Sequence, residues 1–399
     1  LPMTPVEEAT EREEAKEKQL LAAPRGETVL SVSPSAPDEA QGVYASLQEA
    51  VGAVAAGEEA TILVEESLTL TEAVRLTGQQ ITLASADPQN PVTICRGEDF
   101  ATIQDNARST YNPAMFEVTV SGGADSLLRV ENIILDDEGK YEGDVFAQAI
   151  SGAAAEGQTK ENHRMVQDAM IAAYGTGTYK AEVVLGEGAV LKNFGGMSAV
   201  RVTENASLTM ESGSLICDEV DVITDRARLH KDSKASDPYF ETETGPAGAV
   251  WVQGYDFVME DGAEIRDVLG RAVYMDGGTA WLNGQIYDLR QDPDTGSNGT
   301  EKRIKDMWQG NNGLAGHIRN NAEMVLGNTF LLDNSNTDIK MDGAFYDCSG
   351  YLEMQQGAVI RNLVGTAIRG HAGTGIEIVV DGEICGILEG GNAINLNES

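Results

Sequence analysis

The sequence predicts an all-β repeat fold in which short strands wind into stacked coils. One motif recurs along the chain: glycine, a small residue, any residue, an aliphatic residue, any residue, then Asn or Asp, as at 188–193, 213–218, 262–267 and 357–362. Short stretches rich in β-branched residues alternate apolar with polar positions, which is typical of strands with one buried face. Gly, Asn and Asp separate them, and these residues tolerate the left-handed backbone of tight turns.

The elements follow in order from the N-terminus. Residues 1–42 are charged and lack a lasting apolar stripe, so we expect a leader or linker with little order. Residues 46–54 begin with a Ser-x-x-Glu capping box and carry apolar residues at helical spacing, which predicts one short capping helix. From there to the C-terminus the apolar period is two, which predicts short strands, for example at 61–64, 68–70, 74–76 and 81–83.

The spacing of the motif indicates how these strands are arranged. It returns after roughly 22–25 residues, enough for three short strands and three turns. A unit of this length cannot bury its apolar residues alone, whereas stacked units bury them against each other. The motif and its flanking strands make residues 43–399 resemble a right-handed parallel β-helix of the pectin-lyase-like class. They resemble most the repeat regions of surface proteins of Gram-positive bacteria.

The resemblance implies a single solenoid with a capping helix, located outside the cell or on a bacterial cell surface. Three polar segments interrupt its rhythm, at about 137–181, 219–247 and 289–320. Two of them start just after the turn Asp of the motif, and the third follows Asp136. We therefore expect three lateral insertions that leave the coils at one corner. Within the first, residues 161–174 have the pattern of an amphipathic helix.

The second and third insertions hold the residues that we expect to bind a partner. Basic and aromatic side chains gather there in an otherwise acidic chain, and long loops often carry function. The candidate binding residues are Arg226, Arg228, His230, Lys231, Tyr239, Arg303, Lys305 and Trp308. The predicted function is non-enzymatic adhesion to a host glycan or glycoprotein, mucin-like or immunoglobulin-like, through this edge.

Two other functions stay open at this point. Lyases of this fold class hold Ca²⁺ with carboxylates next to a basic residue that abstracts a proton. Carboxylates gather where two of the insertions begin, near the same expected edge as Arg226, Arg228 and Lys231; they are Asp136, Asp137, Glu138, Asp218, Glu219 and Asp221. Three short fragments resemble motifs of polygalacturonase-like hydrolases, at 303–305, 336–338 and 370–371. Their order along the chain differs from the order in those hydrolases. We therefore assign no catalytic residue and no resident metal or cofactor. The third function is a passive spacer within a larger surface protein.

The composition of the chain excludes two classes of binding partner. The chain has 64 Asp and Glu against 28 Lys and Arg, a net charge of −36, which is unsuited to nucleic acid or anionic membranes. No apolar run is long enough to cross a bilayer. We expect the chain to be a monomer. The cysteines, at 95, 217, 348 and 385, are expected to be small core residues. A disulfide between Cys348 and Cys385 remains an open alternative.

Overall fold

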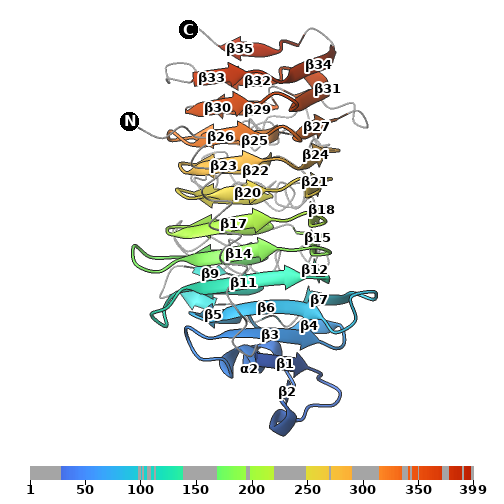
Figure 1. Cartoon of the computed structure of the whole chain (residues 1–399), viewed down its shortest axis with the longest axis vertical. Helices are drawn as coiled ribbons and strands as arrows, with labels where there is room; N and C mark the ends of the chain where they lie inside the picture. Colours follow the sequence, from blue (N-terminus) through green and yellow to red (C-terminus); the bar gives the residue numbers. More distant parts are fainter. Residues whose placement is uncertain are drawn as a thin grey trace, which may run out of the picture.

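The structure is a computed structural model of the chain. It describes residues 28–97, 100, 103–105, 109–111, 114–137, 169–194, 198–219, 249–268, 271–289, 314–334, 340–341, 344–348, 350–370, 377–388 and 391–396. These residues form a nearly all-β stack of parallel strands, as the alternating apolar pattern predicted, and Figure 1 shows them one above another along the long axis. No helix in these ranges is long and apolar enough to span a bilayer.

Three parallel sheets, called A, B and C, make up the stack. Sheet A contains, in spatial order, β2 (Val43–Tyr44), β1 (Thr28–Val32), β3 (Glu59–Val64), β6 (Gln80–Ser85), β11 (Ser126–Glu131), β14 (Ala181–Leu185), β17 (Ala206–Met210), β20 (Phe257–Met259), β23 (Thr279–Leu282), β26 (Glu323–Leu326), β30 (Tyr351–Met354) and β33 (Glu377–Val380).

Sheet B contains β4 (Leu68–Leu70), β7 (Val92–Arg96), β12 (Ile133–Asp136), β15 (Val190–Lys192), β18 (Leu215–Cys217), β21 (Glu264–Arg266), β24 (Gln285–Tyr287), β27 (Leu331–Asp333), β28 (Lys340–Met341), β31 (Val359–Gly365) and β34 (Glu383–Leu388). Sheet C contains β5 (Val74–Thr77), β10 (Phe116–Thr119), β13 (Ile171–Tyr174), β16 (Val200–Thr203), β19 (Val250–Gln253), β22 (Arg271–Asp276), β25 (Leu314–Arg319), β29 (Phe345–Cys348), β32 (Ile368–Gly370) and β35 (Ile394–Leu396).

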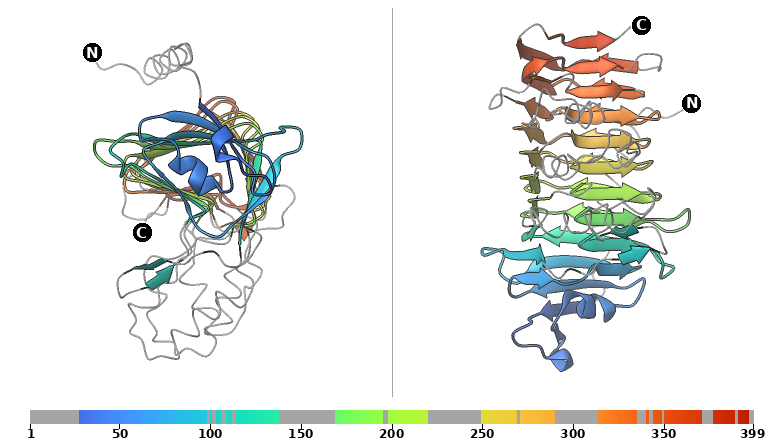
Figure 2. Two further views of the ribbon diagram at one scale, coloured as in Figure 1. Left: turned by 90° about the horizontal axis from the view of Figure 1, so that it is seen from below. Right: turned by 180° about the vertical axis from the view of Figure 1, so that it is seen from behind.

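The chain visits the sheets in a constant order. From β3 onward it passes from sheet A to sheet B to sheet C and then returns to sheet A beside the strand that it last formed there. One such passage forms one coil. This order is compatible with a parallel β-helix, and the views along and across the stack in Figure 2 show the strands of successive coils superimposed.

The core follows from the period of two along each strand. In β11, Leu128 and Val130 are fully buried, and the intervening Arg129 lies on the outer surface. Parallel pairing keeps this alternation in register, because Leu128 pairs with Ile81 below it and with Val183 above it. Equivalent residues therefore stack on one another at the β-sheet spacing and form one continuous apolar core.

The N-terminal end of the stack is closed by helix α2 (Leu47–Gly52), confirming the predicted capping helix. Leu47, Ala50 and Val51 are buried, and Figure 2 (left) shows the helix lying across the end of the coils. The expectation of little order up to residue 42 is wrong for its last part. Residues Thr28–Val32 form β1, which pairs with β3, and Glu39–Gln41 form a short 3-10 helix, η1.

Two expected insertions end earlier than predicted. The described end of the helix expected at 161–174 is strand β13, whose Ile171 pairs with Phe116 and Val200 in sheet C. Strand β25 likewise occupies the end of the third segment. A hairpin of β8 (Ile103–Asp105) and β9 (Ser109–Tyr111) lies between β7 and β10, at a place where the three-insertion prediction has none. It stands apart from the stacked strands in Figure 2 (left).

The structure corrects the expectation that the cysteines are core residues. Cys95, Cys217 and Cys385 lie on the outer side of sheet B, because the isoleucine before each one takes the inward position. Cys217 is still buried, but Cys95 and Cys385 are only partly buried. Cys385 is a free thiol, so it forms no disulfide with Cys348.

Candidate ligand-binding face

The residues predicted to bind a partner lie outside the described residues. Arg226, Arg228, His230, Lys231 and Tyr239 fall within 220–248, and Arg303, Lys305 and Trp308 fall within 290–313. The strands on either side of these segments are described. Each segment follows a strand of sheet B, β18 or β24, and precedes a strand of sheet C, β19 or β25. Their predicted role in binding therefore stays a prediction.

The outer face of sheet C carries an unusual set of side chains next to these connections. Phe116, Ile171, Val200, Val250 and Val273 are paired across successive strands and point inward. The residue after each of them points outward. In spatial order these outward residues are Glu117, Ala172, Arg201, Trp251 and Tyr274.

Aromatic rings and guanidinium groups alternate on this face. The Arg201 guanidinium carbon lies 5.1 Å from the ring centroid of Tyr174 and 5.4 Å from that of Trp251. The Trp251 and Tyr274 rings meet edge to face, with centroids 6.3 Å apart. Arg271 lies 5.1 Å from the Tyr274 ring centroid. We call these five residues, Tyr174, Arg201, Trp251, Arg271 and Tyr274, the sheet C ladder.

Contacts of this kind pre-arrange the ladder. A cation over a ring face and an edge-to-face ring pair each add about 0.5–1.5 kcal/mol beyond burial, which restricts the side chains to one arrangement. The Tyr174 hydroxyl also forms a hydrogen bond with the Arg201 guanidinium. All five side chains are half-buried, so each keeps some surface in contact with solvent.

The Trp251 indole is a ladder group with an unsatisfied polar atom in the described part of the chain. The Trp251 indole nitrogen is buried and donates no hydrogen bond there. A buried donor without an acceptor costs about 1–3 kcal/mol, so native proteins rarely leave one unpaired.

The ladder ends toward the N-terminal coils. Ala172 is fully buried and adds no functional group. Below it, the Arg75 Nε atom lies 2.6 Å from a Glu117 carboxylate oxygen, so these two outward charges neutralise each other. The ladder is therefore a bounded patch over β13, β16, β19 and β22.

The carboxylates considered for the lyase are engaged in the protein's own contacts. Asp137 forms a buried ion pair with Arg96, with an Nε–Oδ1 distance of 2.8 Å and side-chain exposures of 1% and 4%. Asp136 accepts a hydrogen bond of 2.7 Å from the Asn193 amide and lies 3.0 Å from the Lys192 ammonium. These contacts link neighbouring coils at the end of sheet B.

Asp218 and Glu219 form no metal site with them in the part of the chain that the structure describes. No group of three or more His, Cys, Asp or Glu side chains is placed there to hold an ion. Asp218 accepts a hydrogen bond from the Cys217 thiol. Burial and then this neighbour raise the pKa of Cys217 to about 12, which keeps the thiol protonated and unreactive.

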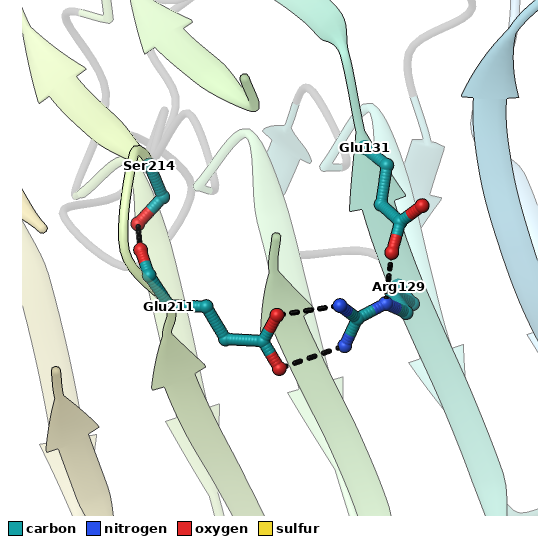
Figure 3. A network of polar contacts seen from close by, with 4 residues as sticks. All are labelled: Arg129, Glu131, Glu211 and Ser214. Atoms are coloured by element: carbon teal, nitrogen blue, oxygen red, sulfur yellow. Dashed lines mark hydrogen bonds and ion pairs between the residues drawn. The ribbon is translucent and has the colours of Figure 1, made fainter. Parts of the chain in front are cut away.

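Sheet A carries a charged cluster with a structural role. The two terminal nitrogens of Arg129 donate to both carboxylate oxygens of Glu211 two coils away, and Nε contacts Glu131 (Figure 3). The hydrogen bonds to Glu211 raise the pKa of the guanidinium further above its usual value, although desolvation opposes this. Because its nitrogens are used within the protein, Arg129 braces β11 against the turn after β17 (Figure 3).

The searches of the protein-family models and of the curated proteins find no match for this chain. Candidate functions therefore depend on the side chains themselves.

The sequence contained a signal for the ladder that motif analysis missed. Three coils share an Ala-Val pair whose valine lies in the sheet C strand, and the next residue is Arg201, Trp251 or Tyr274. Aligning the repeats on this pair places those side chains in one outward column. The stacking distances and the position of Tyr174 in the next column required the structure.

Proposed function

We propose that the chain is a single right-handed parallel β-helix of the pectin-lyase-like kind, as found in surface proteins of Gram-positive bacteria. The parallel order of three sheets supports this proposal. Each passage from a strand of sheet A through sheets B and C to the next strand of sheet A is a crossover between parallel strands. Such crossovers are right-handed in about 98% of cases.

The proposed function of this β-helix is non-enzymatic binding of a host glycan or glycoprotein outside the cell. The sheet C ladder carries this proposal. The C–H faces of sugar rings pack on exposed aromatic rings, and Trp, Tyr and Arg dominate the energy of binding surfaces.

The ladder also favours binding over the passive-spacer alternative. A spacer needs only polar outward side chains, whereas here a Trp, two Tyr and two Arg gather on one sheet beside the loop-bearing corner. The basic and aromatic residues expected in 220–248 and 290–313 would extend this face if they fold toward it. The lyase or hydrolase alternative is retained as an outcome of the test below.

A glycan array followed by titration tests the proposal. Trp251→Ala should weaken binding of the captured glycan at least about tenfold, because truncating an aromatic anchor typically costs about 2 kcal/mol or more. Trp281→Ala is the matched control, since Trp281 is half-buried on the outer face of sheet A. Circular dichroism should show that both variants keep the β fold.

Two results would count against this function. Equal binding by the wild type and Trp251→Ala would remove the ladder from the binding site. Release of unsaturated product from uronate polymers with Ca²⁺, without stable capture of any glycan, would favour the lyase. Binding of a purified mucin or immunoglobulin that competes with the glycan would identify the class of partner.

A further inference from the structure

The corner between sheet C and sheet A carries two exposed tyrosines. Tyr179 lies in the turn between β13 and β14 and is 36% exposed, and Tyr255 lies in the turn between β19 and β20 and is 38% exposed. Among the described residues, the other exposed large apolar side chains belong to β1 or to the last described coil; they are Val29, Val380, Ile394 and Leu396. Between these two ends, the exposed large apolar side chains of the described chain lie at this one corner.

The two tyrosines are two coils apart along the stack. Strands β13, β16 and β19 are consecutive in sheet C, and β14, β17 and β20 are consecutive in sheet A. One coil therefore separates the turns that hold Tyr179 and Tyr255, which places their backbones about 9.6 Å apart at the β-sheet spacing. Figure 1 shows the turn before β14 projecting from the side of the stack.

The neighbouring turns contact the backbone of these tyrosines. The Asn205 side-chain amide donates a hydrogen bond of 3.1 Å to the Tyr179 carbonyl oxygen. On the other side of Tyr255, Gly278 has φ 79°, and a Cβ atom there would lie 2.1 Å from the Tyr255 carbonyl oxygen. This position therefore requires glycine, which brings no side chain toward Tyr255.

The turn that holds Tyr179 is fixed by its own hydrogen bonds. The Thr176 amide donates to the Tyr179 carbonyl oxygen at 2.9 Å, and the Tyr179 amide donates to Thr176 Oγ1 at 3.2 Å. The next amide, of Lys180, donates to an Asp125 carboxylate oxygen at 2.7 Å. A side chain on a fixed backbone loses less conformational freedom when it binds a ligand, which favours affinity.

The charges around this corner disfavour an anionic ligand. Glu204 is exposed in the turn between the two tyrosines, and Asp256 directly follows Tyr255. Lys180, next to Tyr179, forms an ion pair with Glu182, with an Nζ–Oε1 distance of 2.5 Å. Carboxylates repel an anion, whereas the C–H face of an uncharged sugar packs on a tyrosine ring without bringing a charge.

The corner is continuous with the sheet C ladder. Trp251 and Tyr255 belong to one coil and are four residues apart, and Tyr174 and Tyr179 belong to another and are five apart. Four residues of extended chain span about 13 Å at most, so an oligosaccharide of several units is long enough to contact both places. The two arginines of the ladder disfavour a cationic ligand, which leaves an uncharged one as the class that suits the whole surface.

We propose that the glycan site continues from the sheet C ladder onto this corner, where Tyr179 and Tyr255 stack on uncharged sugar units. The ligand is then an oligosaccharide of several units and not a single terminal sugar. This inference rests on the proposed glycan-binding function and adds to it the length and the charge of the ligand.

Uncharged oligosaccharides of increasing length test the inference. Three series serve as probes, namely oligomers of glucose, of N-acetylglucosamine, and of alternating galactose and N-acetylglucosamine, each with two, four and six units. Calorimetric titration of the wild type should show at least one series whose binding tightens at least about tenfold from two to six units. The reason is that the longer chain reaches the corner as well as the ladder.

Variants then assign this gain with length to the corner. In the double variant Tyr179→Ser/Tyr255→Ser, the two-unit probe should bind as it does to the wild type, and most of the gain with length should be lost. Tyr179→Phe/Tyr255→Phe retains the rings and should retain the gain. The controls are Thr178→Ala, in the same turn, and Val29→Ser, at the N-terminal end; both side chains are exposed, and both variants should bind as the wild type does.

The possible failures separate this inference from the function on which it rests. Equal affinity of the wild type for two-unit and six-unit probes would overturn the inference, and so would an unchanged gain with length in the serine double variant. If no uncharged series binds while the array still captures a charged glycan through Trp251, the inference is wrong and the proposed function stands. If no glycan of any kind is captured, both are wrong.

Discussion

At the scale of single residues, the turn after sheet B explains the last position of the sequence motif. Asn193, Asp218, Asp267 and Asp288 each follow a sheet B strand and have φ values of 57°, 55°, 52° and 50°. Residues with a Cβ atom seldom adopt this left-handed conformation, and Asn and Asp tolerate it best. The prediction that the motif Asn and Asp residues form left-handed turns is confirmed at these positions.

Glu204 is neither Asn nor Asp but has a left-handed backbone, and this residue provides a test of stability. Glu204 has φ 53° and lies on the surface between β16 and β17. Glutamate has no side-chain group short enough to compensate for the left-handed backbone, so Glu204→Asn should raise the free energy of unfolding by about 0.5–1 kcal/mol. Urea denaturation measures this difference.

The control separates backbone strain from charge. Glu65→Asn removes an acidic residue that is also exposed but is not among the described residues with positive φ. It should change the free energy of unfolding by less than Glu204→Asn does. An equal gain at both positions would attribute the effect to reduced net charge.

At the scale of secondary-structure elements, α2 shows how much a local sequence can specify. The Ser46 Oγ atom accepts a hydrogen bond of 3.2 Å from the Glu49 amide, and the Ser46 amide donates one of 3.1 Å to the Glu49 carboxylate. This is the capping box that the sequence predicted. Because α2 also closes the core, its stability affects the whole N-terminal end.

Removal of the cap should therefore weaken the fold. Ser46→Ala deletes the acceptor for the Glu49 amide and should lower the free energy of unfolding by about 1 kcal/mol. Ser207→Ala, on the outer face of β17, is the control and should have a smaller effect. No loss of stability in Ser46→Ala would mean that packing of Leu47 and Val51 holds the helix without its cap.

At the scale of the whole molecule, whose net charge is −36, the exposed acidic side chains of the described residues surround an apolar core. Asp261 and Asp381 are exposed next to turn glycines, as expected from their place in the repeat. Glu211 instead serves the ion pair with Arg129. Charges of this kind on the outside of a long sheet keep its faces soluble and oppose lateral association.

The lower burial of the last described coil predicts a gradient of stability along the stack. Amide hydrogens of β33 and β35 should exchange at least about tenfold faster than those of β30 and β32, because exposed edge strands open locally at lower free energy. Hydrogen exchange followed by mass spectrometry measures this. Equal protection in the two layers would indicate that the last coil is covered in solution.

The sequence alone specified the class of fold, because the information is local and repeated. Alternation in β11 determines which side chains face inward, and the motif Asn and Asp residues determine where the chain turns. The sequence pattern wrongly predicted a helix for residues 171–174, since Ile-Ala-Ala-Tyr suits a helix as well as a strand. Pairing with β10 and β16 decided in favour of the strand.

The candidate site depended on tertiary structure for a physical reason. Tyr174, Arg201, Trp251 and Tyr274 belong to four successive coils, and only parallel register stacks their outward side chains on one face. Sequence periodicity predicts that a residue points outward, whereas the residues beside it on the surface are decided by strand pairing between coils.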